Sequence, residues 1–185
     1  MAAMPPQYRF SVNDYERMIR HGILTENSKV ELIRGEIVAK MPIGDPHIAC
    51  VNRLNRLLVR AVGDDAIVSI QNPVRLPDSE PEPDVVLLVP RADDYANGKA
   101  TTADVLLLIE VSDTSLAYDR GVKLPLYAEA GIAEYWIVNL SDRCLHRYRQ
   151  PQLDGTYAEV VTLGVTDMVE LLLLKSVVFS VSSMF

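Results

Sequence analysis

The sequence predicts an α/β (α+β) domain in which a mixed β-sheet is flanked by helices, with an added N-terminal hairpin and added C-terminal strands. Three observations support this prediction. The candidate elements follow the order helix, three strands, helix, strand. Two of these strands are nearly continuous apolar runs, which suit strands buried on both faces of a sheet. The chain has 185 residues and is 49% hydrophobic, enough for one domain with a sizeable core.

The N-terminal part should form a helix and a hairpin. Ser11 is a good helix N-cap, apolar residues follow it at helical spacing, and the helix should end near Gly22. Residues 29–33 and 36–40 flank Arg34-Gly35, a pattern typical of a β-hairpin.

A second helix is expected over residues 46–62, because apolar residues recur there at intervals of three and four and form one face. These residues are Ile48, Val51, Leu54, Leu58 and Ala61. Arg53, Arg56 and Arg60 fall together on another face of this helix. That face could contact phosphates, and a solvated face explains it equally well.

The rest of the chain alternates between strands and helix. The first strand, residues 66–76, contains Pro73, which marks a bulge or a sheet edge. A polar loop is expected at 90–102. The remaining predicted elements are strands at 84–89 and 104–111, a helix at 118–130, a strand at 134–139, a hairpin at 143–149 and 156–163, and a buried strand at 169–178.

The formal net charge of −7 limits the functions that the chain can have. Proteins that grip nucleic acid without sequence preference are usually basic, so the charge argues against a strong DNA clamp. A nuclease remains possible, because a metal ion can supply positive charge locally.

Cys50 and Cys144 show no zinc-binding spacing and are expected to be reduced thiols. No signal peptide or membrane span is readable, so a cytoplasmic protein without a membrane partner is expected.

Two acids stand at the ends of apolar strands. Asp84 opens one strand and Glu110 lies near the end of the next. Burying an unpaired charge is costly, and a shared divalent cation would relieve that cost for both residues. Hard oxygen ligands of this kind suit magnesium or manganese. Two alternatives remain open: Asp84 could cap its own turn after Pro83, and Glu110 could belong to a structural ion pair.

Pro83-Asp84 followed by Glu110-Val111-Ser112 resembles the two halves of the PD-(D/E)XK nuclease motif, and the order of elements resembles the core of that superfamily. More narrowly, the chain is similar, over about residues 10–185, to a bacterial family described as putative restriction endonucleases and long listed as a domain of unknown function. The segments that carry this resemblance are residues 31–36, 82–85, 110–112, 118–123 and 131–138.

The chain departs from the simple motif at one position. The motif places a lysine two residues after its second acid, and here that residue is Ser112. In the resembling family the lysine moves to the following helix, where Lys123 matches it. The resemblance implies that Lys123 orients the attacking water and offsets phosphate charge. The alternative is a solvated helix lysine that pairs with Asp119.

Three further residues are secondary candidates for the site. Glu31 could point into the cleft or outward from its hairpin. His47 lies at a helix start, where it could act as a base, contact a phosphate or have no chemical role. Tyr127 follows Lys123 by four residues, so the two share a helix face, and core packing would also explain Tyr127.

These observations predict a divalent-metal-dependent endonuclease that hydrolyses phosphodiester bonds of nucleic acid, with DNA favoured. Asp84, Glu110 and Lys123 would be catalytic, and Mg²⁺ or Mn²⁺ would be held by Asp84, Glu110 and the Val111 backbone carbonyl. The alternative is an inactive nuclease-fold protein that serves as a binding or regulatory module.

We expect a flexible tail over residues 1–9 and a single nuclease-like domain over residues 10–185. A homodimer is also expected, because cutting both strands of a duplex suits two-fold symmetry.

Overall fold

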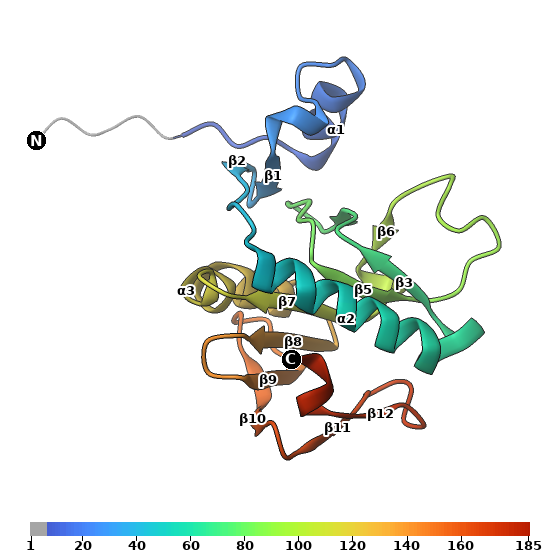
Figure 1. Cartoon of the computed structure of the whole chain (residues 1–185). Coiled ribbons are helices and arrows are strands. Elements are labelled where there is room, and N and C mark those ends of the chain that lie inside the picture. The colour runs from blue at the N-terminus through green and yellow to red at the C-terminus, as the bar shows by residue number, and fades with distance from the viewer. Residues whose placement is uncertain (1–6) are drawn as a thin grey trace, which may run out of the picture.

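The computed structural model describes residues 7–185, which contain a six-stranded mixed sheet with helices on both faces (Figure 1). This architecture confirms the predicted fold class. Most of the predicted tail, residues 1–6, lies outside the described residues. Arg9, within the range predicted as tail, is held by the Arg34 carbonyl and by Glu36.

The sheet order is β10-β9-β8-β7-β5-β3, and only the β7–β8 pair is parallel. The six strands are β3 (Ile67–Ile70), β5 (Val85–Leu88), β7 (Val105–Ser112), β8 (Glu134–Asn139), β9 (Cys144–Pro151) and β10 (Tyr157–Gly164). The predicted strand at 134–139 and the late hairpin are therefore confirmed.

Side chains of the central strands alternate between two cores. Leu107 and Ile109 of β7 pack with α2 (Asp45–Val62), whereas Leu108 packs with α4 (Leu124–Glu129) on the opposite face. Successive residues of a strand point to opposite faces, so Glu110 and Ser112 follow Leu108 onto the α4 side. This alternation decides on which face of the sheet the acids lie.

The N-terminal helix and hairpin form as predicted, and they lie together at one end of the molecule (Figure 1). Helix α1 (Val12–Arg20) begins at a capping box in which Ser11 and Asp14 bond reciprocally. Strands β1 (Val30–Ile33) and β2 (Glu36–Ala39) are antiparallel, and a bridge from Leu32 to Glu80 joins them to the rest of the chain. This bridge brings the hairpin against the segment that leads into β5.

Helix α2 confirms the predicted helix, but its buried face differs in part from the predicted one. Val51, Leu54 and Leu58 are buried as expected, whereas Ile48 is exposed and its neighbour His47 is buried. The three arginines differ in their surroundings. The Arg53 guanidinium donates to the Met184 carbonyl at 3.1 Å, while Arg56 and Arg60 are exposed.

Two predicted segments differ in detail. The strand at 66–76 is two strands, β3 and β4 (Val74–Arg75), because Gln71 adopts a φ of +51° and breaks the extended run. The loop at 90–102 contains β6 (Ala100–Thr101), which pairs with β4.

The prediction of one buried strand at 169–178 is wrong. That segment is a hairpin of β11 (Met168–Glu170) and β12 (Val178–Ser180), with a turn through the polar Lys175-Ser176 pair.

The predicted helix at 118–130 is present but is not a uniform α-helix. A short α3 (Leu116–Tyr118) leads into a π-helical turn, Asp119–Lys123, which continues directly into α4. Such wider turns are rare and occur frequently at functional sites. Both ends of this turn, Asp119 and Lys123, are buried.

A buried polar network lies on β8, away from this turn. The carboxylate of Glu134, which is fully buried, accepts bonds from the Trp136 indole at 2.9 Å, from Arg149 Nε at 2.8 Å and from the Leu172 backbone N–H at 2.7 Å. The network ties the sheet to the segment after β11. The indole of Trp136 packs in the core.

Candidate active site

Asp84 immediately precedes β5 and lies beside Glu110 and Val111 of β7. Val85, the first residue of β5, pairs with Ile109, so Asp84 lies one residue before the paired part of the strand. The Val111 backbone N–H donates a 2.8 Å hydrogen bond to Asp84 Oδ2. Both acids are buried, with exposed fractions of 8% for Asp84 and 3% for Glu110. The strand register therefore positions two carboxylates at one end of the sheet.

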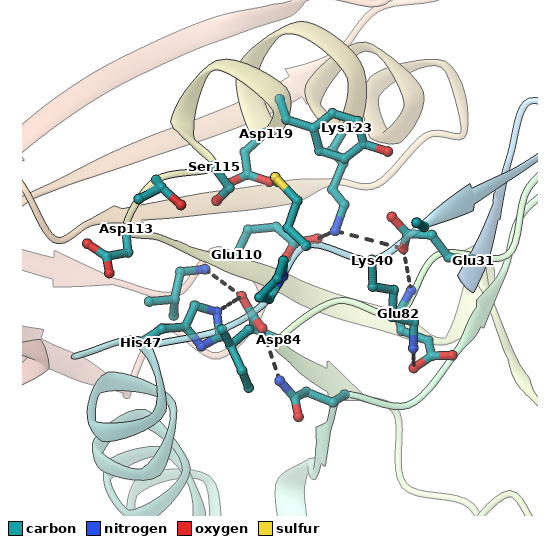
Figure 2. Close-up of a pocket in the computed structure, with 18 of the residues that line it drawn as sticks. Glu31, Lys40, His47, Glu82, Asp84, Glu110, Asp113, Ser115, Asp119 and Lys123 are labelled. Atoms are coloured by element: carbon teal, nitrogen blue, oxygen red, sulfur yellow. Dashed lines mark hydrogen bonds and ion pairs between the residues drawn. The ribbon is translucent and has the colours of Figure 1, made fainter. Parts of the chain in front are cut away.

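Lys123 and Tyr127 both reach Glu110 from the helical side. Lys123 Nζ lies 2.8 Å from Glu110 Oε1 and 4.0 Å from Glu31 Oε2. The Tyr127 hydroxyl donates to the same Oε1 at 2.7 Å. Figure 2 shows Lys123 between the two glutamates. The structure thus brings Asp84, Glu110, Lys123 and Tyr127 together, and Lys123 bonds to Glu110 rather than to Asp119.

His47 contacts the other acid. Its Nε2 lies 2.9 Å from Asp84 Oδ2, while Gln71 Nε2 donates to Asp84 Oδ1 at 3.4 Å. Burial lowers the pKa of His47, but the bond to Asp84 and the charges of Asp84, Asp119 and Asp113 raise it above its ordinary value. Conversely, burial raises the pKa of Asp84, and the contact with His47 outweighs that effect and lowers it. His47 and Asp84 therefore hold each other in their charged forms.

Glu31 points into the same space rather than outward from its hairpin. Its exposed fraction is 5%, and its Oε2 accepts a 3.2 Å bond from the Glu82 backbone N–H. Sequence periodicity could not decide this orientation, because it depends on how the hairpin docks against the segment before β5.

Sequence reasoning missed Gln71, which contacts Asp84, and it did not assign Asp119 to the site. Asp119 is the more buried of the two. Its Oδ2 accepts 2.6 Å bonds from the hydroxyls of Ser112 and Ser115. Ser112 occupies the lysine position of the simple motif and here bonds to an acid. The signal available in the sequence was the stretch Tyr118 to Lys123, in which Asp119 was considered only as a partner for Lys123.

Apart from Tyr127 and Ser112, these residues line one pocket of about 660 Å³. It is lined by six carboxylates against three lysines, a formal net charge of −3 before His47 is counted. The acids are Glu31, Glu82, Asp84, Glu110, Asp113 and Asp119, and the lysines are Lys29, Lys40 and Lys123. Such an excess of negative charge opposes the entry of any anion unless a cation accompanies it.

The candidate ligands suit a magnesium-type site, in which water and substrate complete the coordination shell, better than a site closed entirely by protein side chains. Among residues 7–185, no group of three or more His, Cys, Asp and Glu side chains is arranged to hold a metal ion. Magnesium is typically held by only one or two carboxylates, with waters and substrate phosphates completing its shell. Glu110 Oε1 is engaged by Lys123 and Tyr127, which leaves Oε2 of this carboxylate available as a ligand.

The pKa values reflect the crowding of charge. Burial raises the pKa of Glu110 to about 8, with Lys123 opposing and Asp84 and Asp119 adding to the shift. Burial also raises the pKa of Asp119 in spite of its two serine partners. For Lys123, burial lowers the pKa, but Glu110 and Glu31 outweigh it and raise the pKa above its ordinary value. The lysine stays charged while the acid at its side resists ionisation.

This crowding predicts a pH-dependent stability in the absence of divalent cations. The pKa of Glu110 is raised from 4.5 to about 8 in the folded protein. The contribution of this group to the free energy of unfolding is therefore fully present below pH 4.5 and is lost as pH rises through about 8. In EDTA, the melting temperature should fall by at least about 3 °C between pH 6 and pH 9, since each kcal/mol moves the melting temperature of such a chain by about 2–4 °C. Glu110→Gln should flatten this slope. A wild-type profile as flat as that of the variant would contradict the shift.

The fold places two buried carboxylates and a buried lysine together at one end of a mixed sheet. The sequence profile of the Uma2 family, described as "Putative restriction endonuclease", matches residues 12–182. The chain therefore belongs to this family.

The fold is similar to a solved structure from Anabaena variabilis ATCC 29413, described as a putative nuclease belonging to DUF820. The TM-score is 0.71 at 16% sequence identity, and the match covers 95% of this chain and 97% of that chain. No curated protein sequence matches the chain. Within residues 7–185, every helix is too short or too polar to cross a membrane.

Proposed function

We propose that the protein is a divalent-metal-dependent endonuclease that hydrolyses phosphodiester bonds of nucleic acid at the pocket around Asp84, Glu110 and Lys123. The observation that carries the proposal is the Lys123–Glu110 contact of 2.8 Å within a pocket that also holds Asp84. Family membership supports the same class of reaction.

Asp84 and Glu110 would hold a magnesium or manganese ion, together with the Val111 carbonyl. When bound, the cation would neutralise phosphate charge and make water a better nucleophile. Lys123 would orient that water and stabilise the charge that develops on the phosphate oxygens. Its buried ammonium is held in place by Glu110 and Glu31, so little reorganisation is needed during the reaction.

The secondary residues would position this machinery. Tyr127 fixes one oxygen of Glu110 and thereby directs the other toward the pocket. His47 and the Val111 N–H both bond to Asp84 Oδ2, which limits rotation of that carboxylate and leaves Oδ1 as the ligand oxygen. Gln71 reaches Oδ1 only through a long contact of 3.4 Å, which a cation could replace.

Magnesium should raise the melting temperature, because a ligand that binds only the native state stabilises it. At 100 times its dissociation constant, the gain is about 2.7 kcal/mol, or roughly 5–10 °C for a chain of this size. Asp84→Asn should abolish the gain, while the matched variant Asp154→Asn, in an exposed hairpin turn, should keep it. Equal magnesium shifts in wild type and Asp84→Asn would refute the assigned ligand.

The second candidate function is a binding or regulatory module without cleavage. The net charge of −7 and the ion-paired state of Lys123 favour it. Incubation with single- and double-stranded DNA and RNA in magnesium or manganese separates the two functions, because only an endonuclease yields cleavage products.

Homodimerisation stays a prediction. Analytical ultracentrifugation measures the oligomeric state directly.

A further inference from the structure

The candidate catalytic groups lie at the bottom of a recess rather than on an open face. Glu110, Lys123 and Asp119 are buried residues, with exposed fractions of 3%, 7% and 3%. Asp113, Ser115 and Lys40, which come from surrounding segments, line the same pocket (Figure 2). A phosphodiester must therefore enter the recess to reach them.

The volume of the recess limits what can enter. A pocket of about 660 Å³ is the size of sites that enclose one small-molecule ligand. A DNA duplex is stiff, with a persistence length of about 150 base pairs, and its phosphates follow a regular helical surface. An unpaired nucleotide can instead rotate its base out of the stack and enter a narrow pocket.

The wall of the recess offers an apolar surface to a base. The segment between β2 and α2 contributes Met41, Pro42 and Ile43, and the segment after β7 contributes Tyr118. Met41 and Ile43 have exposed fractions of 46% and 50%, which is high for large apolar side chains. Bases of unpaired strands are held by aromatic stacking and apolar contact, without regard to sequence.

The charged residues of the recess suit a short length of nucleic-acid backbone. Lys29 lines the mouth of the recess and is exposed, so it can meet a flanking phosphate. With a whole-chain charge of −7, the protein has little overall attraction for the dense charge of a long duplex. The charges therefore suit local contact with one or two phosphates.

From the depth, the volume and the apolar wall together, we propose that the substrate is an unpaired strand of nucleic acid, bound with one base against Met41, Ile43 and Tyr118 and its phosphodiester at the carboxylates. This inference rests on the proposed nuclease function and narrows it to single strands and unpaired ends, flaps or bulges. On this proposal an intact duplex is a poor substrate, because a stiff duplex places few phosphates inside a recess unless its strands open.

The first test compares cleavage of four substrates that share one sequence. These are single-stranded DNA, single-stranded RNA, a blunt duplex, and the same duplex with an unpaired flap. In magnesium or manganese, at least one single strand should be cut ten or more times faster than the blunt duplex. Products from the flapped duplex should map to its unpaired part. A blunt duplex cut as fast as the single strands would overturn the inference and leave the proposed nuclease function standing.

The second test measures binding and so does not depend on cleavage. Fluorescence anisotropy with a labelled single-stranded oligonucleotide and its duplex, in calcium, should show at least tenfold tighter binding of the single strand. If no substrate is cut, the proposed function fails, and this measurement alone decides the inference. Equal affinities, or no binding of the single strand, would then overturn it.

The apolar wall gives the matched variants. Met41→Ser combined with Ile43→Ser should raise the KM, or the Kd in calcium, about five- to tenfold for single strands, with kcat unchanged, because the lost contact is made equally in ground and transition states. Ile19→Ser removes an equally exposed isoleucine of α1 and should change neither value. An unchanged KM and Kd in the double variant, at an unchanged melting temperature, would show that the wall does not hold the base.

Discussion

Lys123→Met should lower the cleavage rate by about two to three orders of magnitude, the scale of losing one stabiliser of transition-state charge. Methionine keeps most of the bulk of lysine but removes the ammonium that lies 2.8 Å from Glu110. Magnesium affinity, measured by calorimetry, should hold or rise slightly, because a nearby positive charge is gone. Single-turnover kinetics on the best substrate measure the rate.

Two variants make this test specific. Arg120→Met removes a neighbouring cation that is exposed and contacts His146 instead of the pocket acids, so it should leave the rate within about twofold. Ser112→Lys in the Lys123→Met background should restore part of the rate, because residue 112 shares a face of β7 with Glu110. If Lys123→Met cuts as fast as wild type, Lys123 has no part in the chemistry.

Glu134→Ala should destabilise the fold by about 3–5 kcal/mol, the usual cost of removing one partner of a buried ion pair. The substitution leaves the Arg149 guanidinium, the Trp136 indole and the Leu172 N–H without their shared acceptor. For a chain of this size the melting temperature should fall by roughly 6–20 °C. Thermal denaturation followed by circular dichroism measures the change.

Glu159→Ala is the matched control for this variant. Glu159 also pairs with an arginine of β9, Arg147, at 2.7 Å, but its side chain is 35% exposed. Partly solvated pairs of this kind contribute at most about 1 kcal/mol. If the two variants lost similar amounts of melting temperature, burial would not determine how much the Glu134 network contributes to stability.

The central strands could be predicted from sequence because their signal is local. Continuous apolar runs identified β5, β7 and β8, and the acids at their ends followed from the position of each run. The resemblance to a known motif then suggested Lys123. The structure adds that Asp84, Glu110 and Lys123 share one pocket, and their catalytic roles stay predictions.

Other features depend on contacts that no local pattern encodes. His47 lies 37 residues from Asp84 in sequence, and its burial depends on how α2 rotates against the sheet, a choice that apolar spacing left open between neighbouring faces. The run at 169–178 is a second case in which the local pattern was not enough. Its apolar composition is that of a strand and does not show where the chain turns. Leu171 is buried and Leu173 is 53% exposed, so tertiary packing rather than hydrophobicity places the turn between β11 and β12.

The π-helical turn Asp119–Lys123 makes the length of this segment more important than its composition. Each residue of an α-helix advances by about 100°, so losing or gaining one residue in the turn would rotate Asp119 out of phase with Lys123 and Tyr127. A Cβ added at Gly121, by contrast, would meet no heavy atom within 4 Å outside its chain neighbours and its own helix backbone. Sequences that build this site should therefore accept a small side chain at 121 while tolerating no insertion or deletion between the acid and the lysine.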